Sequence, residues 1–216
     1  MKNKKAFNNS VEEYDYKIDK LRASEEKIIK KFFKGKKVLD IGCGVGRTTI
    51  NLINKGYDVI GIDYSEKLIK RAKEKYPKID FRVMDACDLN FEDNLFDIVF
   101  FSNNGLDYAY PYKRRIKAIK EAKRILKKGG VFIYSSHKRF YIKFPVIRKY
   151  PFIRIHYLLF ILSNIFFFNN YTYEHYNFGS LKTFCKNNSL NDSKRAGFKN
   201  VRRIDNKYNC YYICWK

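Results

Sequence analysis

The sequence is poor in cysteine, and none of its cysteines are spaced as a metal or redox pair would be. The five cysteines are odd in number and include no Cys-x-x-Cys pair. A disulfide framework or a zinc site is therefore not expected. Cys210 and Cys214 share one face of a predicted strand, without a nearby histidine or acid, so we expect them in the core. We predict reduced thiols, a cytoplasmic protein and no bound metal.

Long apolar runs are also lacking. Residues 1–37 carry too many charges to contain the apolar region of a signal peptide, so none is expected. The most apolar stretch lies at 151–168, where Arg154 and His156 leave an uninterrupted run of only about a dozen residues, too short for a transmembrane helix. We therefore predict no membrane-spanning segment.

Acidic residues are scarce relative to basic ones. The chain has 45 Lys and Arg against 22 Asp and Glu, which gives a net charge of +23. Such a balance raises the possibility of a nucleic-acid partner. The basic residues are nevertheless spread over nearly every segment. The densest cluster comprises Lys113, Arg114, Arg115, Lys117, Lys120, Lys123, Arg124, Lys127 and Lys128.

This basic cluster alternates with an apolar stripe at helical spacing. The stripe consists of Ile116, Ile119, Ala122, Ile125 and Leu126. Because an amphipathic helix turns its apolar stripe toward the core, we interpret the basic residues as its solvated face. A nucleic-acid partner is the less favoured alternative.

The glycine-rich turn lacks the third glycine of a dinucleotide-binding loop. An apolar strand leads into Gly42, Gly44 and Gly46, but a G-x-G-x-x-G loop would place its last glycine where Arg47 stands. Glycines allow close approach of a ligand, and the helix that follows offers free N–H groups. Asp63 ends the next apolar strand, where α/β folds bind ribose hydroxyls. The sequence therefore predicts a nucleoside-cofactor site in which a cationic group can sit against Asp40.

The acid, the glycine loop and the later acid together resemble the first motifs of class I S-adenosylmethionine-dependent methyltransferases. The resemblance is strong over 35–136 and weak over 190–216. It implies S-adenosylmethionine as cofactor, with its methionine part at the glycine loop and its ribose at Asp63. It also implies that Asp85 accepts from the adenine amino group and that the backbone of Ala86 meets the ring. The implied cofactor-binding set is Asp40, Gly42, Cys43, Gly44, Gly46, Asp63, Tyr64, Asp85, Ala86 and Asn103.

Short apolar strands alternate with amphipathic helices through the first two thirds of the chain. The pattern predicts strands at 37–41, 58–62, 79–84, 96–102 and 131–136, and helices at 11–34, 46–55, 65–75 and 113–127. This alternation is typical of an α/β fold with a doubly wound, mostly parallel sheet. Strands near 200–205 and 208–215 look like the antiparallel hairpin that closes the methyltransferase sheet. We therefore expect a seven-stranded, Rossmann-like methyltransferase fold in a single domain, 1–216, with an N-terminal helical segment at 1–34.

Two motifs of other enzymes are missing. The N/D-P-P-Y/F motif is absent, which argues against amino methylation of DNA bases. No nucleophilic triad is present, but a sulfonium is already an activated methyl donor, so alignment and exclusion of water are enough. The absence of a triad therefore does not argue against an enzyme.

Polar residues follow two of the predicted strands at the expected cofactor edge. Asn103 and Asn104 end one strand and can orient an acceptor or the methionine group. His137 ends the next, where a neutral imidazole can take a proton from a hydroxyl or an amine. A structural role for His137 is the equal alternative. His175 is a second candidate base, and His156 is expected to be structural.

The aromatic stretch 138–178 breaks the alternation of strands and helices. We predict a helical cap over the site, with an apolar or aromatic acceptor; peripheral membrane contact through 143–168 is the alternative. The sequence thus predicts a methyltransferase acting at O, N or C of an apolar or aromatic small molecule. An RNA methyltransferase, or a non-catalytic cofactor-binding scaffold at a membrane or an acidic partner, remains open.

Overall fold

The computed structural model describes residues 20–137, 171–176, 179–184, 189–206 and 209–216. The elements are α3 (Ala23–Phe32), β1 (Lys37–Ile41), α4 (Arg47–Ile53), β2 (Asp58–Asp63), α5 (Glu66–Lys75), β3 (Phe81–Val83), β4 (Phe96–Phe101), η1 (Gly105–Tyr108), α6 (Tyr112–Ile125), β5 (Leu126–His137), β6 (Tyr171–Tyr176), β7 (Gly179–Phe184), α9 (Ser189–Arg195), β8 (Asn200–Asp205) and β9 (Asn209–Trp215).

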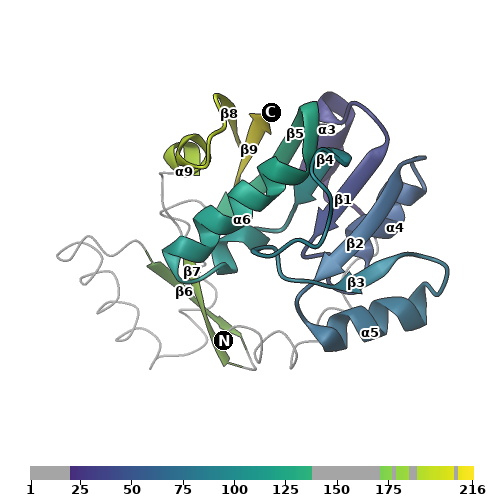
Figure 1. The fold of residues 1–216 in the computed structure, drawn as a ribbon. Coiled ribbons are helices and arrows are strands. Elements are labelled where there is room, and N and C mark those ends of the chain that lie inside the picture. Colours follow the sequence, from purple (N-terminus) through teal and green to yellow (C-terminus); the bar gives the residue numbers. More distant parts are fainter. Residues whose placement is uncertain (1–19, 138–170, 177–178, 185–188, 207–208) are drawn as a thin grey trace.

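Seven strands form one sheet in the order β3-β2-β1-β4-β5-β9-β8 (Figure 1). The first five are parallel, whereas β9 runs antiparallel to both β5 and β8. The predicted mostly parallel, seven-stranded α/β fold and its closing hairpin are confirmed. Because parallel strands end at the same edge, residues that follow β1, β2, β4 and β5 lie along one edge of the sheet.

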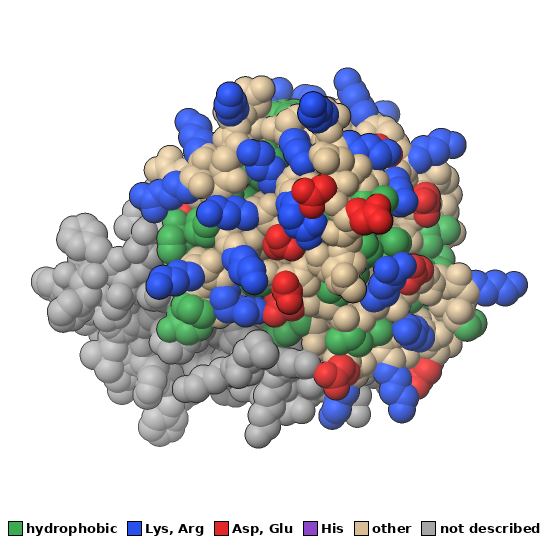
Figure 2. Space-filling view, viewed as in Figure 1, with side chains coloured by type: hydrophobic (Ala, Val, Ile, Leu, Met, Phe, Trp, Pro, Cys, Tyr) green, Lys and Arg blue, Asp and Glu red, His purple; other side chains and the backbone are tan. Residues whose placement is uncertain are grey.

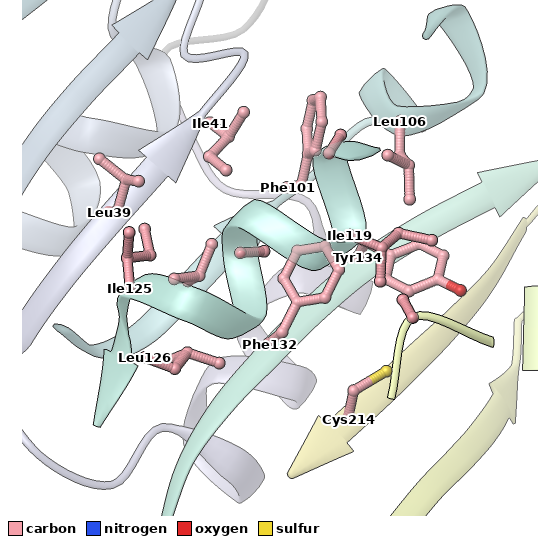
Figure 3. Close-up of a cluster of buried hydrophobic side chains, with 14 of the residues drawn as sticks. Leu39, Ile41, Phe101, Leu106, Ile119, Ile125, Leu126, Phe132, Tyr134 and Cys214 are labelled. Atoms are coloured by element: carbon pink, nitrogen blue, oxygen red, sulfur yellow. The ribbon is translucent and has the colours of Figure 1, made fainter. Parts of the chain in front are cut away.

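Both faces of the sheet are buried, and β1 shows how the sequence achieves this. Successive side chains of a strand point to opposite faces. Leu39 and Ile41 therefore join a core cluster with α6, while Val38 joins a second cluster with α3 and α4. Figure 3 shows the first cluster, in which Leu39 and Ile41 lie with side chains of α6, β4, β5 and β9. Cys210 and Cys214 are part of it, as predicted.

Helix α5 begins as its sequence predicts. The hydroxyl of Ser65 accepts a hydrogen bond from the backbone N–H of Leu68 at 3.3 Å, which is the bond expected of an N-cap serine. Its buried residues Ile69 and Ala72 pack with Phe81 of β3 and Cys43 of the glycine loop. The helix thereby supports the loop from the edge of the sheet.

The predicted boundary between α6 and β5 is wrong. Helix α6 ends at Ile125, two residues earlier than predicted, and β5 begins at Leu126, so Gly129 and Gly130 lie within the strand. The reason is pairing: Leu126 aligns with Phe96 of β4, and the register then shifts before Val131 pairs with Ile98. Gly129, at φ +77°, adopts a backbone conformation that few other residues tolerate.

A second correction concerns the face of α6. Arg115, which was expected on the solvated side, is buried, and Ile116 is only partly buried. The buried stripe is Arg115, Ala118, Ile119, Ala122 and Ile125. A guanidinium can replace an apolar residue there because buried carboxylates pair with it, as described below.

The expected helical cap is also corrected where the structure describes it. Residues 171–176 form β6, which pairs antiparallel with β7 in a separate two-stranded sheet. The aromatic and β-branched composition of Tyr171, Thr172 and Tyr173 favours a strand over a helix. Residues 138–170 and 177–178 lie outside the described part, as do residues 11–19 of the predicted helix 11–34. The side chain of His175 and the residue His156 are therefore not placed.

Among the described residues, no helix is long and apolar enough to cross a membrane. Cys43, Cys87, Cys210 and Cys214 are buried free thiols. The cytoplasmic location remains a prediction.

Candidate active site at the strand edge

The glycine loop between β1 and α4 has the backbone that its sequence predicts. Gly42, Gly44 and Gly46 all have positive φ, at 68°, 58° and 90°. A Cβ at Gly46 would lie 2.6 Å from the Phe81 ring, so glycine is required there by packing. A Cβ at Gly44 would meet no atom within 4 Å. The middle of the loop therefore has room for a ligand to approach the backbone.

Asp63 connects this loop to the end of β2. One carboxylate oxygen accepts from the backbone N–H of Gly44 at 3.1 Å, and the other accepts from that of Ser65 at 2.9 Å. Burial raises the pKa of Asp63 to about 6, although the backbone N–H groups favour its charged form. The predicted ribose acid and the predicted methionine loop are thus brought into direct contact.

Asp40 lies on the face of β1 that packs against α4. The hydroxyl of Thr49 donates to its carboxylate at 2.7 Å, and the side chain is buried. Burial raises the pKa of Asp40 to about 7. Asp40 therefore joins β1 to the first turn of α4, and its carboxylate is not exposed at the loop where the sequence predicts a cationic group.

Arg47, the residue that replaces the third dinucleotide glycine, holds α3 against the start of α4. Its guanidinium donates to both oxygens of the buried Glu25, at 2.7 and 2.8 Å. Ser102, at the end of β4, also donates to Glu25. Burial alone would raise the pKa of Glu25, but Arg47 and the other donors keep it lower than usual. Glu25 was not predicted as part of the site, because it meets Arg47 across 22 residues of chain.

Asn103 and Asn104 follow Ser102, and both have left-handed backbone conformations, with φ of 54° and 60°. The side-chain oxygen of Asn103 accepts from the Arg22 guanidinium at 2.5 Å. The side-chain oxygen of Asn104 is buried with no hydrogen-bond partner in the part of the chain that the structure describes. This turn therefore presents an acceptor for a polar ligand group next to the glycine loop.

The predicted adenine pair lies beyond β3. Asp85 accepts from the backbone N–H of Cys87 at 2.9 Å and forms an ion pair with Arg114 of α6. Burial would raise the pKa of Asp85, but these donors hold it below its ordinary value. Ala86 and Tyr64 are partly buried, and Cys43 in the glycine loop is buried. An adenine amino group at Asp85 would have to share that carboxylate with Arg114.

His137 ends β5 at the same edge and contacts a carboxylate that the sequence analysis did not select. Asp107 of η1 is fully buried, and one of its oxygens lies 2.8 Å from both the backbone nitrogen and Nδ1 of His137. The other oxygen accepts from Arg115 at 2.7 Å. The only feature of the sequence that could have marked Asp107 is its place shortly after β4. An aspartate in such a place is usually an ordinary turn residue.

Comparisons with known proteins indicate what kind of domain carries this strand edge. The family model described as "Methyltransferase domain" matches residues 38–130, which contain the glycine loop, Asp63 and Asp85. Residues 38–130 therefore form a methyltransferase domain. Its cofactor is S-adenosylmethionine.

Two curated relatives of this methyltransferase differ in how much of them the chain covers. YqeM of Bacillus subtilis, named as a methyltransferase, is 32% identical over 109 residues, and the match covers 49% of this chain and 44% of that protein. Demethylmenaquinone methyltransferase of Staphylococcus aureus is 29% identical over 205 residues, covering 91% of this chain and 80% of the relative. The chain thus spans less than half of the first relative and most of the second.

A solved structure of an S-adenosylmethionine-dependent methyltransferase from Methanosarcina mazei has the same fold. It superposes with a TM-score of 0.68 at 21% identity, covering 91% of this chain and 98% of that one. At this identity the likeness supports the Rossmann-like fold and no finer property.

The described residues fit the cofactor. The open backbone at Gly44 and the partnerless oxygen of Asn104 both occur where β1 and β4 end. When bound, S-adenosylmethionine supplies a methyl group to the acceptor, and the electron pair of the broken carbon–sulfur bond remains on sulfur. The residues that would hold it are Asp40, Gly42, Cys43, Gly44, Gly46, Asp63, Tyr64, Asp85, Ala86 and Asn103. Their individual roles remain predictions.

Proposed function

We propose that this methyltransferase acts on an apolar or aromatic small molecule, at an oxygen, nitrogen or carbon atom that carries a proton. The observation that carries the proposal is His137, which ends β5 on the same sheet edge as the glycine loop and contacts a buried carboxylate. A histidine so placed can remove the proton that the acceptor loses.

The relative from Staphylococcus aureus supports a first substrate to test. Its name, demethylmenaquinone methyltransferase, states its acceptor, and its alignment covers 91% of this chain. We therefore propose to test demethylmenaquinone before other apolar acceptors.

RNA is the second candidate acceptor. On the face shown in Figure 2, Lys and Arg side chains outnumber acidic ones, and Lys113, Lys117 and Lys120 of α6 are exposed. Two other basic residues are already paired: Arg124 with Glu121 and Asp93, and Lys127 with Asp97. This pairing reduces the charge available for phosphate, so the small molecule is favoured.

Methyl transfer from labelled S-adenosylmethionine into a fractionated cell extract distinguishes the candidates. We expect label in the organic-soluble fraction, and in demethylmenaquinone when it is supplied alone. Label in RNA, with binding that weakens steeply as salt concentration rises, would favour the RNA enzyme. Absence of adenosylhomocysteine with every fraction would instead indicate a non-catalytic scaffold.

A further inference from the structure

We infer that Asp107 is a positioning residue which, with Arg115, holds His137 with its proton on Nδ1, so that Nε2 is the nitrogen that accepts the acceptor's proton. The inference deepens the proposed function and rests on it for the role of His137. The acceptor's O–H, N–H or C–H bond would break, its electron pair would form the bond to the methyl carbon, and the proton would pass to Nε2.

The first support is that one oxygen of Asp107 contacts His137 twice. It lies 2.8 Å from the backbone nitrogen and 2.8 Å from Nδ1. The backbone contact fixes the end of β5 relative to the carboxylate, and the ring contact then fixes the rotation of the imidazole. A carboxylate that only joined η1 to β5 would need the first contact and not the second.

The second support is that the surroundings require Asp107 to be an acceptor. The backbone N–H of His137 and the guanidinium of Arg115 can only donate hydrogen bonds. Ser136 also donates, at 2.8 and 3.0 Å to the two oxygens. A carboxylate surrounded by obligatory donors is ionised, and it therefore takes a proton-bearing Nδ1 as its partner. The neutral ring then has its lone pair on Nε2.

The third support is the charge of the cluster around His137. Arg115 pairs with Asp107 and, at 3.0 Å, with Asp192 of α9, and all three side chains are almost fully buried. Two carboxylates face one guanidinium, so the three ionised groups carry a net charge of −1. A positive charge formed on His137 would neutralise this cluster.

Groups from several elements contact His137 or this cluster. Besides Asp107, η1 supplies Tyr108, whose ring lies edge-on at 6.2 Å from the imidazole. Tyr112 of α6 donates to Asp192 at 2.7 Å and accepts from Arg195 at 3.2 Å. On β9, Asn209 is the cross-strand neighbour of His137. Asp107 is the only acid among the described residues that forms an ion pair with the His137 ring.

The test measures the tautomer of His137 directly, in the full chain without cofactor or acceptor. Nitrogen NMR of the labelled protein distinguishes a proton on Nδ1 from one on Nε2, and His137→Gln identifies the signal among the three histidines. We expect the neutral ring of the unaltered chain to carry its proton on Nδ1. A neutral ring protonated on Nε2 would overturn the inference without any variant.

Asp107→Asn tests the positioning role, with Asp80→Asn as the matched control at an exposed ion pair. We expect Asp107→Asn to reduce the Nδ1-protonated population and to shift the titration of His137 to lower pH, whereas the control changes neither. Methyl transfer should slow about tenfold or more, as for loss of general-base catalysis, with unchanged cofactor affinity. An unchanged tautomer and titration in a folded Asp107→Asn protein would contradict the inference. A protein that has the expected tautomer but transfers no methyl group would instead contradict the proposed function.

Discussion

The two halves of the strand edge are built in different ways. In the cofactor half, at the ends of β1 and β2, the bonds join groups that are close in sequence and often use the backbone. Thr49 and Asp40 are nine residues apart, and Gly44 and Asp63 are 19 apart. In the half that we propose for the acceptor, around η1 and the end of β5 and called the acceptor half below, Asp107 and His137 are 30 apart, and Arg115 and Asp192 are 77 apart.

This difference explains why only the cofactor half can be recognised as a motif in the sequence. A backbone N–H is present at nearly every position, so the cofactor half needs only glycines and acids at fixed spacing. The acceptor half depends on side-chain charges that meet through tertiary packing. The comparison predicts that substitutions in the acceptor half mainly affect stability and proton transfer, whereas those in the cofactor half mainly affect ligand affinity.

The largest expected effect is from Arg115→Met. It would leave Asp107 and Asp192 buried without their shared cation, and breaking a buried ion pair costs about 3–5 kcal/mol of unfolding free energy. Urea unfolding measures the loss. Arg71→Met, at an exposed pair with Glu74, is the control, and its effect should be about 0–1 kcal/mol. Similar losses in the two variants would show that the acceptor half is not held by its buried charges.

The next largest effect is expected in the cofactor half. Asp63→Ala removes an acceptor between the glycine loop and the expected ribose. We expect cofactor affinity to fall about 10- to 100-fold, since hydrogen bonds to a charged group contribute roughly 1.5–3 kcal/mol. Calorimetry with S-adenosylmethionine gives the affinity, and thermal melting checks the fold. Asp58→Ala, at the exposed start of the same strand, is the control; equal affinity in both variants would remove Asp63 from the cofactor site.

The smallest effect concerns pH and Asp40. Its pKa is about 7 in the folded protein against an ordinary value of 3.8, so the folded state holds the proton more tightly than the unfolded state. The unfolding free energy that Asp40 contributes is fully present below pH 3.8, and it is lost as the pH rises through about 7.

Urea unfolding between pH 5 and 8 tests this linkage. Asp63, with a pKa of about 6, contributes in the same direction. The unfolding free energy should decline between pH 5 and 8. Asp40→Asn should reduce this decline by on the order of 1 kcal/mol without abolishing it. Asp58→Asn, at the exposed start of β2, should leave the decline unchanged. An undiminished decline in Asp40→Asn would show that Asp40 is not the titrating group.

Much of the fold was predictable because its signals are local. Strand β1 was predicted with its observed bounds, and Ser65 caps α5 as expected. The start of β5 was not predictable, since Leu126 joins the strand only by pairing with Phe96. The position of Arg115 was mistaken for the same reason: composition marks arginine as exposed, and only the carboxylates of η1 and α9 make its burial favourable.

By itself, the sequence determined the alternation of strands and helices, the glycine loop with Asp40 and Asp63, and hence the methyl donor. These features follow from backbone geometry and short spacings, which are properties of the local chain. Tertiary structure alone decided that Glu25 meets Arg47 and that Asp107, Arg115 and Asp192 are buried together. The physical reason is that a buried charge is stable only beside its counter-charge, and the fold brings that partner from a distant part of the sequence.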